Sequence, residues 1–469
     1  MYVYGIRGAL WNDTDPTHPG SGVAMSTVVL SQLTKVYPTG VTAVDHLDLT
    51  VADGEVMVLL GPTGCGKSTV LRLIAGLDPA TSGEISFGGA GIDHISARER
   101  EVAMVFQDYG LYPHLTVAEN IAFPLINHHI EEAERDQRVR EVAELLNLTD
   151  VLTKRPDRLS GGERQRVAMG RAIVRQPRVF LLDEPLSNLD AAVRESVRNY
   201  LSELIHQLGV ATIYVTHDQT EAMCLGDRVA VMRQGRIEQV GTPEEIYSDP
   251  HRLFVAAFVG SPRMNLLQAA VQAEPGRRTV VDLGAQTLHL PWSDARARTL
   301  ATYHGARVTV GFRPDALVPT ADAEGADLHG VVRLVELRGH DVLVHLETGS
   351  VPTPHRVSQL ELPDGELAQA VGGDPPPPHP LRRRLARIVP QPRRADDSGR
   401  YGLQPSYVPE AEPGREAIGD VTARMPAALA PRVGETLSLR LDPDHLYLFD
   451  RAGDRIALPA PQVALREAV

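Results

Sequence analysis

The chain has 469 residues, more than one hydrophobic core usually supports, and its 43% hydrophobic and 23% charged residues are typical of a globular protein with at least two domains. The formal net charge of −13 argues against nucleic acid as a partner, and two cysteines, Cys65 and Cys224, are too few for a disulfide framework and fit a reducing cytoplasm. The sequence contains no run of about 18 to 20 apolar residues that would cross a bilayer, so we expect any membrane connection to come through a partner.

The first 25 residues have neither a basic start nor an apolar core. We therefore expect a disordered N-terminal tail at 1–25 rather than a signal peptide. Met25 is an alternative translational start, because an ordered pattern begins only at about Val28.

Residues 26–246 have the pattern of an α/β domain with a mainly parallel sheet, because short apolar runs alternate with amphipathic segments. The expected strands cover residues 55–61, 102–107, 178–184, 210–217 and 227–235. Between residues 107 and 160 the strands stop, and a helical face is marked at i, i+3, i+4 and i+7 by Val139, Val142, Ala143 and Leu146. This indicates a helical subdomain inserted at about 108–170.

The remaining residues, 247–469, predict a second domain of short strands. Alternating patterns at 306–314, 331–347 and 435–450 favour a small β-barrel or sandwich. A proline-rich insert at about 371–431 interrupts them, and we expect most of it to be disordered or extended. Its basic patch fits a solvated linker better than a lipid or protein docking site; the patch contains Arg382, Arg383, Arg384 and Arg387.

Residues 61–69 read GPTGCGKST and fit the phosphate-loop pattern between an expected strand and an expected helix. Backbone N–H groups of such a loop surround the α- and β-phosphates of a nucleotide, Lys67 reaches the β- and γ-phosphates, and Ser68 ligates Mg²⁺. The residues predicted to bind the nucleotide are Gly61, Pro62, Thr63, Gly64, Cys65, Gly66, Lys67, Ser68 and Thr69. Cys65 is either a thiol with a lowered pKa at the helix end or a small packing residue.

Polar residues at the ends of three further expected strands complete the predicted site. In RVFLLDEP, Asp183 is placed to hold Mg²⁺ and Glu184 to polarise a water, although an Asp-Glu pair can also simply end a strand. His217 could contact the γ-phosphate or orient the water, whereas a lone histidine is more often a packing residue. Gln107 could contact Mg²⁺ or the water.

Residues 159–168 read LSGGERQRVA, with a serine and two glycines in front of a helical pattern. Glycine inside a helix costs about 1 kcal/mol relative to alanine, so the pair fits a helix entrance better, with Ser160 as the N-cap. Such an entrance either favours an anion or is an ordinary capped helix start.

Taken together and in this order, these motifs resemble those of the ATPase subunits of ABC transporters. The matching pieces are the phosphate loop at 61–68, Q-loop Gln107, signature LSGGE at 159–163, Walker B with Glu184, D-loop SNLD at 187–190 and switch His217. The resemblance implies a P-loop NTPase core with an inserted helical subdomain, followed by an all-β, oligonucleotide-fold-like regulatory domain, and hydrolysis of ATP with Mg²⁺.

The family resemblance also implies roles for residues that spacing alone does not assign. Tyr37 would stack on adenine, and Asp190 belongs to the D-loop. The signature would bind the γ-phosphate of ATP held by another subunit; its residues are Ser160, Gly161, Gly162 and Glu163. Glutamate at 163, where glutamine is commoner, puts that contact in question unless Arg164 or Arg166 compensates.

Within the family, four pieces resemble the ATPases of maltose and trehalose importers: residues 107–125, YVTHDQTEAMCLGDRVAVM, GTPEEIYSDP and FVGSPRMN. This implies a homodimer around two ATP, two membrane permease subunits, an extracytoplasmic sugar-binding protein and a place on the cytoplasmic face of the membrane. Permease contacts are implied for Tyr109, Leu111, Tyr112 and Pro113, although local packing explains them nearly as well. Two alternatives stay open: another solute, such as polyamine, iron or glycerol phosphate, and a non-transport ABC ATPase.

Overall fold

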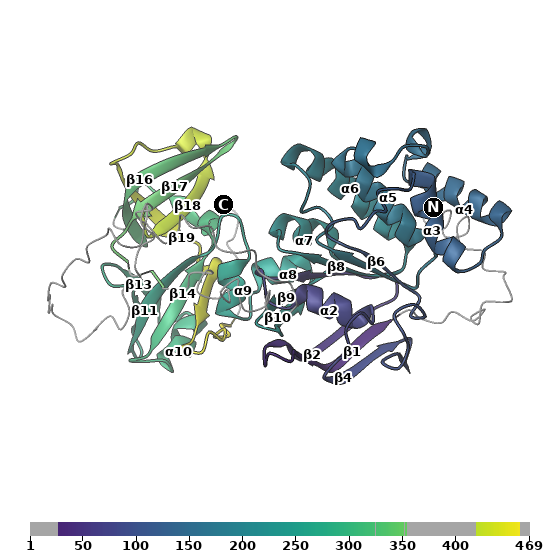
Figure 1. The fold of residues 1–469 in the computed structure, drawn as a ribbon. Coiled ribbons are helices and arrows are strands. Elements are labelled where there is room, and N and C mark those ends of the chain that lie inside the picture. The colour runs from purple at the N-terminus through teal and green to yellow at the C-terminus, as the bar shows by residue number, and fades with distance from the viewer. Residues whose placement is uncertain (1–26, 324, 351, 354–418, 460–469) are drawn as a thin grey trace, which may run out of the picture. The chain divides into compact units, whose positions relative to one another are not determined.

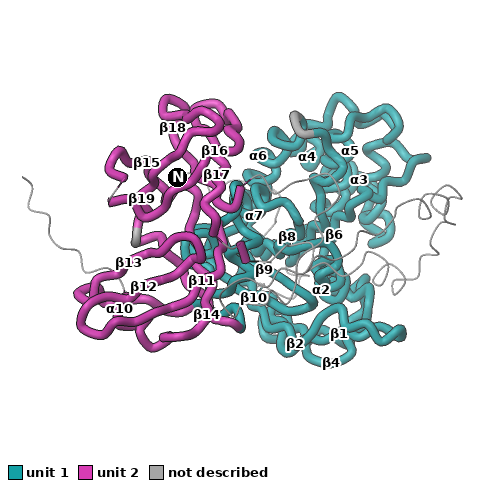
Figure 2. Tube along the Cα trace, turned by 90° about the vertical axis from the view of Figure 1, so that its left-hand side faces the viewer, with its two compact units in different colours: residues 1–264, 357–362, 452–455 teal, residues 265–356, 363–451, 456–469 magenta. Residues whose placement is uncertain are grey.

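The computed structural model describes residues 27–323, 325–350, 352–353 and 419–459, which belong to two compact units (Figure 2). Unit 1 ends at Met264 and also includes Ala452–Arg455; the other described residues from Asn265 on form unit 2. The first domain predicted from the sequence ends earlier, at residue 246. In the structure, α8 (Pro243–Ser248) and α9 (Leu253–Phe258) contribute Ile246, Phe254 and Phe258 to the core of unit 1.

A six-stranded sheet runs through unit 1 in the order β10-β9-β3-β8-β7-β6. Its strands are β3 (Val56–Leu60), β6 (Val102–Val105), β7 (Val179–Asp183), β8 (Ala211–Thr216), β9 (Arg228–Arg233) and β10 (Arg236–Gly241). The first five are the strands that the sequence predicts, and they pair in parallel; only β10 is antiparallel to its neighbour. The expectation of a mainly parallel sheet is confirmed.

Each face of this sheet buries a separate core, because successive side chains of a strand point to opposite faces. In β3, Val56, Val58 and Leu60 join one cluster, while Met57 and Leu59 join the other. The first face is covered by helices and the second by α2 (Lys67–Ile74) and a four-stranded antiparallel sheet (Figure 1). That sheet has the order β2-β1-β4-β5, with β1 (Val28–Val36), β2 (Thr42–Val51), β4 (Ser82–Phe87) and β5 (Ala90–Gly91).

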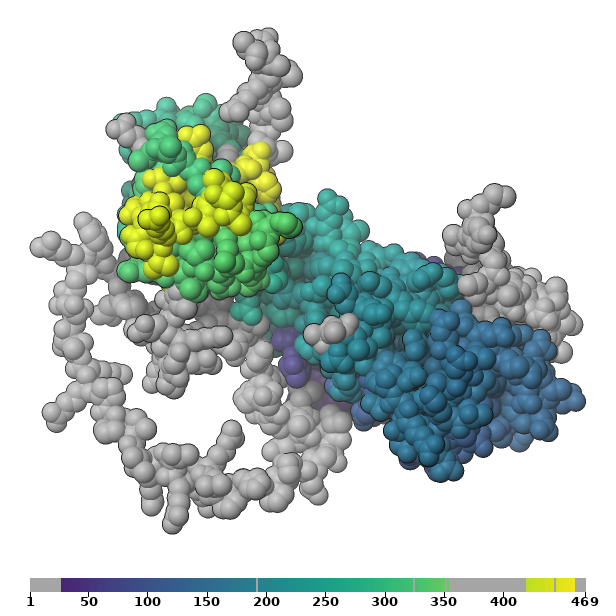
Figure 3. All heavy atoms as spheres, turned by 90° about the horizontal axis from the view of Figure 1, so that it is seen from above, coloured from purple at the N-terminus to yellow at the C-terminus, as the bar shows by residue number. Residues whose placement is uncertain are grey.

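The segment between β6 and β7 is helical. It contains α3 (Val117–Asn127), α4 (Glu132–Leu145), the short turns η1 (Thr149–Val151) and η2 (Pro156–Arg158), and α5 (Gly161–Ile173). In α4 the predicted apolar face is buried through Val139, Val142 and Ala143, and Leu146 at its C-cap is also buried. In the space-filling view the blue atoms of this segment gather at one end of unit 1 (Figure 3). Two more helices follow, α6 (Ala191–Leu208) and α7 (Gln219–Leu225).

Unit 2 is built from two five-stranded antiparallel sheets, in the orders β13-β12-β11-β14-β20 and β15-β19-β16-β17-β18. The first contains β11 (Asn265–Glu274), β12 (Arg278–Asp282), β13 (Thr287–Pro291), β14 (Arg307–Phe312) and β20 (Leu446–Phe449). The second contains β15 (Leu317–Pro319), β16 (Leu328–Arg338), β17 (Asp341–Glu347), β18 (Val421–Pro426) and β19 (Thr436–Leu441). Both sheets contribute to one core, and the three predicted strand patterns correspond to β14, to β16 with β17, and to β19 with β20.

The proline-rich insert predicted at 371–431 ends earlier than the sequence analysis placed it. Strand β18 (Val421–Pro426) lies inside these bounds and pairs with β17, so this stretch belongs to the second sheet of unit 2. The rest of the predicted insert up to residue 418, its basic patch and the predicted N-terminal tail lie outside the described residues.

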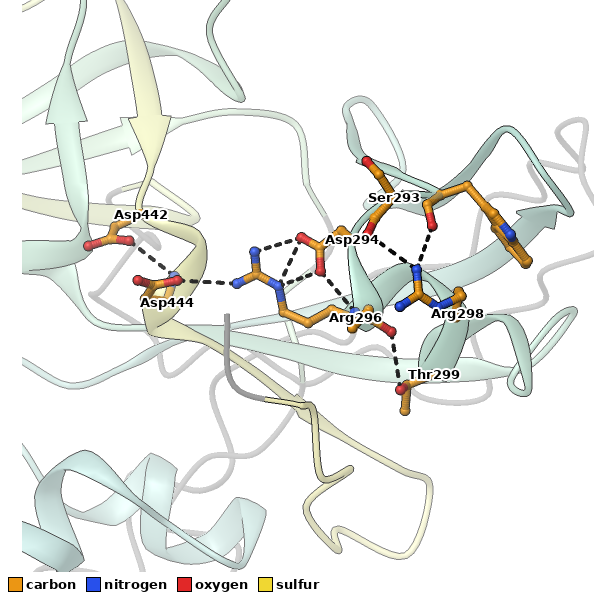
Figure 4. A network of polar contacts seen from close by, with 9 residues as sticks. Ser293, Asp294, Arg296, Arg298, Thr299, Asp442 and Asp444 are labelled. Carbon is orange, nitrogen blue, oxygen red and sulfur yellow. Dashed lines mark hydrogen bonds and ion pairs between the residues drawn. The ribbon is translucent and has the colours of Figure 1, made fainter. Parts of the chain in front are cut away.

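A network of charged groups fastens the helix α10 (Ala295–Ala301) of unit 2 (Figure 4). Asp294 caps this helix by accepting from the Arg296 N–H at 2.8 Å, and the Arg296 guanidinium donates back to both Asp294 oxygens. That hydrogen bonding lowers the pKa of Asp294. Arg296 also reaches Asp444 at 3.4 Å, in the turn η6 (Pro443–His445) that precedes β20. The network therefore joins α10 to the turn that leads into the last strand of the sheet.

No helix among the described residues is long and apolar enough to span a membrane.

The C-terminal end of α2 is capped by one buried arginine. The Nη1 of Arg100 donates to the carbonyl oxygens of Leu73 at 2.8 Å and Ile74 at 3.0 Å, and its Nε donates to Ile95 at 3.0 Å. The last carbonyls of a helix have no partner within the helix, and a cation there also complements the helix dipole. Arg100 is only 8% exposed, so water does not replace it easily.

We therefore expect Arg100→Leu to lower the free energy of unfolding of unit 1 by roughly 2–4 kcal/mol, because two buried carbonyls and a partly buried one lose a charged donor. The measurement is calorimetry of the full chain, in which the transition that Arg100→Leu shifts is compared with that of the parent protein. Arg98→Leu is the matched control, since Arg98 is exposed and donates to the single carbonyl of Asn127. Equal effects of the two changes would contradict the capping role.

Candidate active site

Four neighbouring parallel strands deliver the predicted catalytic residues to one edge of the sheet. In the order β3, β8, β7 and β6, their carboxyl ends lead to the phosphate loop, to His217, to the pair Asp183 and Glu184, and to Gln107. The crevice beyond the carboxyl ends of parallel strands is where ligands bind in sheets of this kind.

The phosphate loop between β3 and α2 is held tightly by the neighbouring backbone. Gly66, the N-cap of α2, has φ = 105°, and a Cβ there would lie 2.2 Å from the Ala43 carbonyl oxygen. A Cβ on Gly61 would lie 2.4 Å from the Met232 carbonyl oxygen. Only glycine fits both the positive φ and the close approach of the Ala43 carbonyl at position 66. This fit lets the loop backbone lie at the N-terminus of α2, where free N–H groups favour an anion.

Lys67 is buried within this loop, with 4% exposed. Its Nζ donates to the carbonyl oxygens of Gly61 at 2.8 Å and Pro62 at 3.0 Å. The amine of Lys67 therefore lies against the backbone at the start of the phosphate loop. Cys65 is also buried, and this burial raises the pKa of its thiol, which favours the packing interpretation over a reactive thiolate.

Ser68 and Asp183 form a pair of oxygen groups between α2 and β7. The Ser68 hydroxyl donates to Asp183 Oδ1 at 2.8 Å. Burial raises the pKa of Asp183, because desolvation penalises the charged carboxylate. The hydrogen bond from the Ser68 hydroxyl lowers the pKa but does not offset this desolvation. A carboxylate and a hydroxyl are hard oxygen ligands of the kind that Mg²⁺ prefers, so the donor set fits the predicted metal.

Glu184 and His217 contact each other directly. His217 Nδ1 lies 3.0 Å from Glu184 Oε2, and the histidine side chain is 54% exposed, so it does not fill a core. Glu184 has φ = 42°, in the left-handed region that costs a non-glycine residue on the order of 1 kcal/mol or more. Its N–H donates to the Val215 carbonyl at 3.1 Å and its carbonyl accepts from Ser187 at 2.8 Å, which together hold this conformation.

The segments around Gln107 and the D-loop are joined by a residue that sequence reasoning did not single out. Asn188 Nδ2 donates to the Gln107 carbonyl oxygen at 2.8 Å, so the D-loop holds the backbone of Gln107, whose side chain is exposed. Two positions further on, Asp190 is the N-cap of α6 and accepts from the Val193 N–H at 3.0 Å. The motif SNLD marked this stretch, but the partner of Asn188 could not be read from it.

The signature forms the capped start of α5, as the sequence predicts. Ser160 and Glu163 form a capping box: the Ser160 N–H and hydroxyl each donate to Glu163 Oε2 at 2.7 Å, and the Glu163 N–H donates back at 3.3 Å. Hydrogen bonding from the Ser160 backbone lowers the pKa of Glu163, so this side chain stays ionised. A Cβ on Gly161 would lie 2.9 Å from Leu189 of the D-loop, so close packing also favours glycine here.

Tyr37 follows β1 and is half-buried. Its ring lies 5.3 Å from the ammonium of Lys35, and its hydroxyl has no hydrogen-bond partner among the described residues. The described contacts do not join Tyr37 to the phosphate loop, and stacking on adenine stays a prediction.

Residues 112–116, between Gln107 and α3, are organised by Asn120, which is fully buried. Its Oδ1 accepts from the Tyr112 N–H at 2.9 Å, and its Nδ2 donates to the carbonyls of Tyr112, Leu115 and Thr116. Tyr109 is also buried, so local packing explains this residue, whereas Leu111 and Tyr112 are half-buried and Pro113 is exposed. Neither the four bonds of Asn120 nor the burial of Tyr109 was evident from the sequence.

Comparisons with known proteins match both units. A family model described as "ABC transporter" matches residues 44–187, and one described as "MalK OB fold domain" matches residues 260–317. The chain is 50% identical to a trehalose/maltose import ATP-binding protein MalK of Thermococcus litoralis, over 70% of this chain and 90% of the relative. It is 46% identical to a trehalose import ATP-binding protein SugC of Mycobacterium tuberculosis, over 74% of this chain and 88% of that relative. The chain is also 46% identical to an sn-glycerol-3-phosphate import ATP-binding protein UgpC of Chromohalobacter salexigens, over 70% of this chain and 86% of that relative.

We expect Lys67→Ala to lower ATP turnover by about 10²-fold or more, because a point charge on the β- and γ-phosphates is lost. Release of inorganic phosphate and equilibrium binding of ATP are the measurements. Thermal unfolding without nucleotide is the control, since it detects any general loss of structure from the two loop hydrogen bonds. Near-normal turnover in the variant would show that the phosphates bind elsewhere.

Proposed function

The chain belongs to the ATP-binding import subunits of ABC transporters, and from this premise we propose that it drives the uptake of a carbohydrate through a membrane permease. As a member of this family it is an ATPase. The observation that carries the proposal is the convergence of the phosphate loop, Asp183, Glu184 and His217 on one sheet edge, in a chain with a MalK-type OB fold domain.

A carbohydrate such as trehalose or maltose is the proposed solute because two of the relatives named above import trehalose or maltose. The UgpC relative keeps glycerol phosphate as the second candidate. Selectivity lies in the binding protein and the permease. Turnover of the ATPase reconstituted with its permease and binding protein, measured with trehalose, maltose and glycerol phosphate in turn, would identify the solute as the one that stimulates hydrolysis.

In the proposed mechanism, the loop N–H groups and Lys67 bind the phosphates of ATP, and Tyr37 stacks on the adenine. Ser68, Asp183 and Gln107 would hold Mg²⁺, which when bound supplies positive charge to the phosphate oxygens. Glu184 accepts a proton from the water that attacks the γ-phosphorus, and the bond to the ADP oxygen breaks. His217 orients the Glu184 carboxylate through the 3.0 Å contact.

The signature is proposed to act across a homodimer, since the chain carries one phosphate loop and one signature. Each site then combines Lys67 of one subunit with Ser160 of its partner. Binding of ATP would change the hydrogen-bond partner of Ser160. Its hydroxyl donates to Glu163 in the structure and would donate to the γ-phosphate instead. Two ATP molecules would close the dimer.

Two permease subunits and an extracytoplasmic sugar-binding protein complete the proposed complex, with this chain on the cytoplasmic face of the membrane. The segment after Gln107 is the proposed contact with the permease. Its exposed Pro113 and half-buried Tyr112 are presented on a loop that Asn120 holds in place, and the Tyr112 ring packs 4.5 Å from that of Phe123.

We expect Glu184→Gln to lower turnover by about 10²- to 10⁴-fold while ATP still binds, since only the proton acceptor is lost. Single-turnover hydrolysis and ATP binding are measured on the same preparation. A loss of ATP binding as large as the loss of turnover would mean that Glu184 is structural.

A mixed dimer tests the action of Ser160 across subunits. One subunit carries Lys67→Ala and the other Ser160→Arg, both in the Glu184→Gln background that prevents turnover. If each site joins Lys67 of one chain to Ser160 of the other, both lesions fall in one site and the second site is intact. The mixed dimer should then occlude about one ATP, and either mutant homodimer none.

Occluded ATP is counted after rapid removal of free nucleotide from a differentially tagged heterodimer. The Glu184→Gln parent, which should occlude ATP at both sites, is the control. Failure of the mixed dimer to occlude while the parent does so would refute the cross-subunit site.

A further inference from the structure

The backbone just after Gln107 adopts an unusual conformation at two consecutive residues. Tyr109 has φ = 62° and Gly110 has φ = 57°, both in the left-handed region. Glycine adopts it freely, whereas a tyrosine there is strained. Because the Tyr109 side chain is buried, the segment is held in this strained form by its surroundings.

Both left-handed residues present their carbonyl oxygens to one side chain, Arg171 in the last turn of α5. Its Nη1 donates to Gly110 at 2.6 Å and its Nη2 to Tyr109 at 2.9 Å. The guanidinium carbon also lies 5.4 Å from the centre of the Tyr112 ring. The planar guanidinium holds these two donor nitrogens at a fixed spacing, which the single nitrogen of a lysine cannot reproduce. Arg171 therefore fixes the backbone two and three residues after Gln107.

The opposite end of the same helix carries the signature. Ser160 caps the start of α5, and the thirteen residues Gly161–Ile173 span about 20 Å. The helix is packed along its length; a Cβ on Gly170 would lie 2.9 Å from Leu146 and 3.3 Å from Ile121. A packed helix moves as a stiff element, so a displacement of its first turn carries its last turn with it.

We propose that Arg171 is a positioning residue that ties Gln107 to Ser160 of the same subunit through α5. The inference rests on the proposed function, in which Ser160 contacts ATP held by the partner. Engagement of Ser160 at one site then places Gln107 at the other site, so the two sites hydrolyse ATP cooperatively. Without the two carbonyl bonds of Arg171, the sites act independently.

The test is Arg171→Lys in the full-length protein, because lysine keeps the charge but replaces the two spaced nitrogens of the guanidinium with a single nitrogen. Misplacing Gln107 should lower kcat by about tenfold or more. The Hill coefficient for ATP should fall from near two towards one. Affinity for ADP, which lacks the γ-phosphate, should stay within about twofold. Arg171→Gln, which removes the charge but keeps an amide donor, is the second variant and should behave alike.

Amide hydrogen exchange gives a readout that does not depend on turnover. In the Glu184→Gln background, ATP should slow exchange in residues 108–112 by about tenfold or more, because closure of the dimer orders the segment. With Arg171→Lys added, ATP should leave this exchange unchanged. Arg175→Lys is the matched control and should behave like the parent, since Arg175 follows α5 but donates to the Arg98 carbonyl.

The outcomes separate the two proposals. If Arg171→Lys keeps the parent's Hill coefficient and its ATP-dependent protection, the inference is overturned and the proposed function stands. Parallel losses of thermal stability, ADP affinity and kcat at an unchanged Hill coefficient would also overturn it, because they describe a purely structural arginine. If the Glu184→Gln parent forms no ATP-dependent dimer, the proposed function fails and the inference fails with it.

Discussion

Every predicted catalytic group depends on one constraint, the parallel pairing of β3, β8, β7 and β6, which brings four carboxyl ends to one edge. The two cores that cover the sheet make this edge rigid, since each fully buried aliphatic side chain contributes about 1.5–3 kcal/mol. That stability supports features that are unfavourable alone: the buried amine of Lys67, the half-buried carboxyl of Asp183 and the left-handed backbone of Glu184.

Much of the fold could be predicted because local pattern and global structure agree. The five strands of the parallel sheet are short apolar runs followed by polar motif residues, and the expected ABC ATPase core with its helical subdomain and OB-fold-like domain is confirmed. The missed features depend on tertiary pairing. Strand β18 has only six residues, and although Val421, Ala423 and Met425 alternate with outward-facing residues, so short a pattern beside a proline-rich stretch is identified as a strand by its pairing with β17. Likewise, α8 and α9 join the first core through Ile246 and Phe254.

The site could be predicted as a set of residues but not as a set of contacts. Spacing identified Lys67, Asp183, Glu184 and His217, because phosphate and metal chemistry need those residue types after parallel strands. Asn188 and Arg171 hold backbone carbonyls of distant segments, and Asn120 holds those of the loop just before its own helix. Every residue has a backbone carbonyl, so the sequence does not show which ones are bonded. Which loops these side chains fasten follows only from how α3, α5 and the D-loop pack.

The pairing of β17 with β18 has a practical consequence. Val421 lies opposite Leu346, although it comes 75 positions later in the sequence. Closure entropy rises only with the logarithm of loop length, so each doubling costs about 0.6 kcal/mol. Because β17 and β18 pair across so long a connection, lengthening that connection further, for example by grafting a fluorescent protein or an affinity module into it, adds little to the cost of closing this sheet.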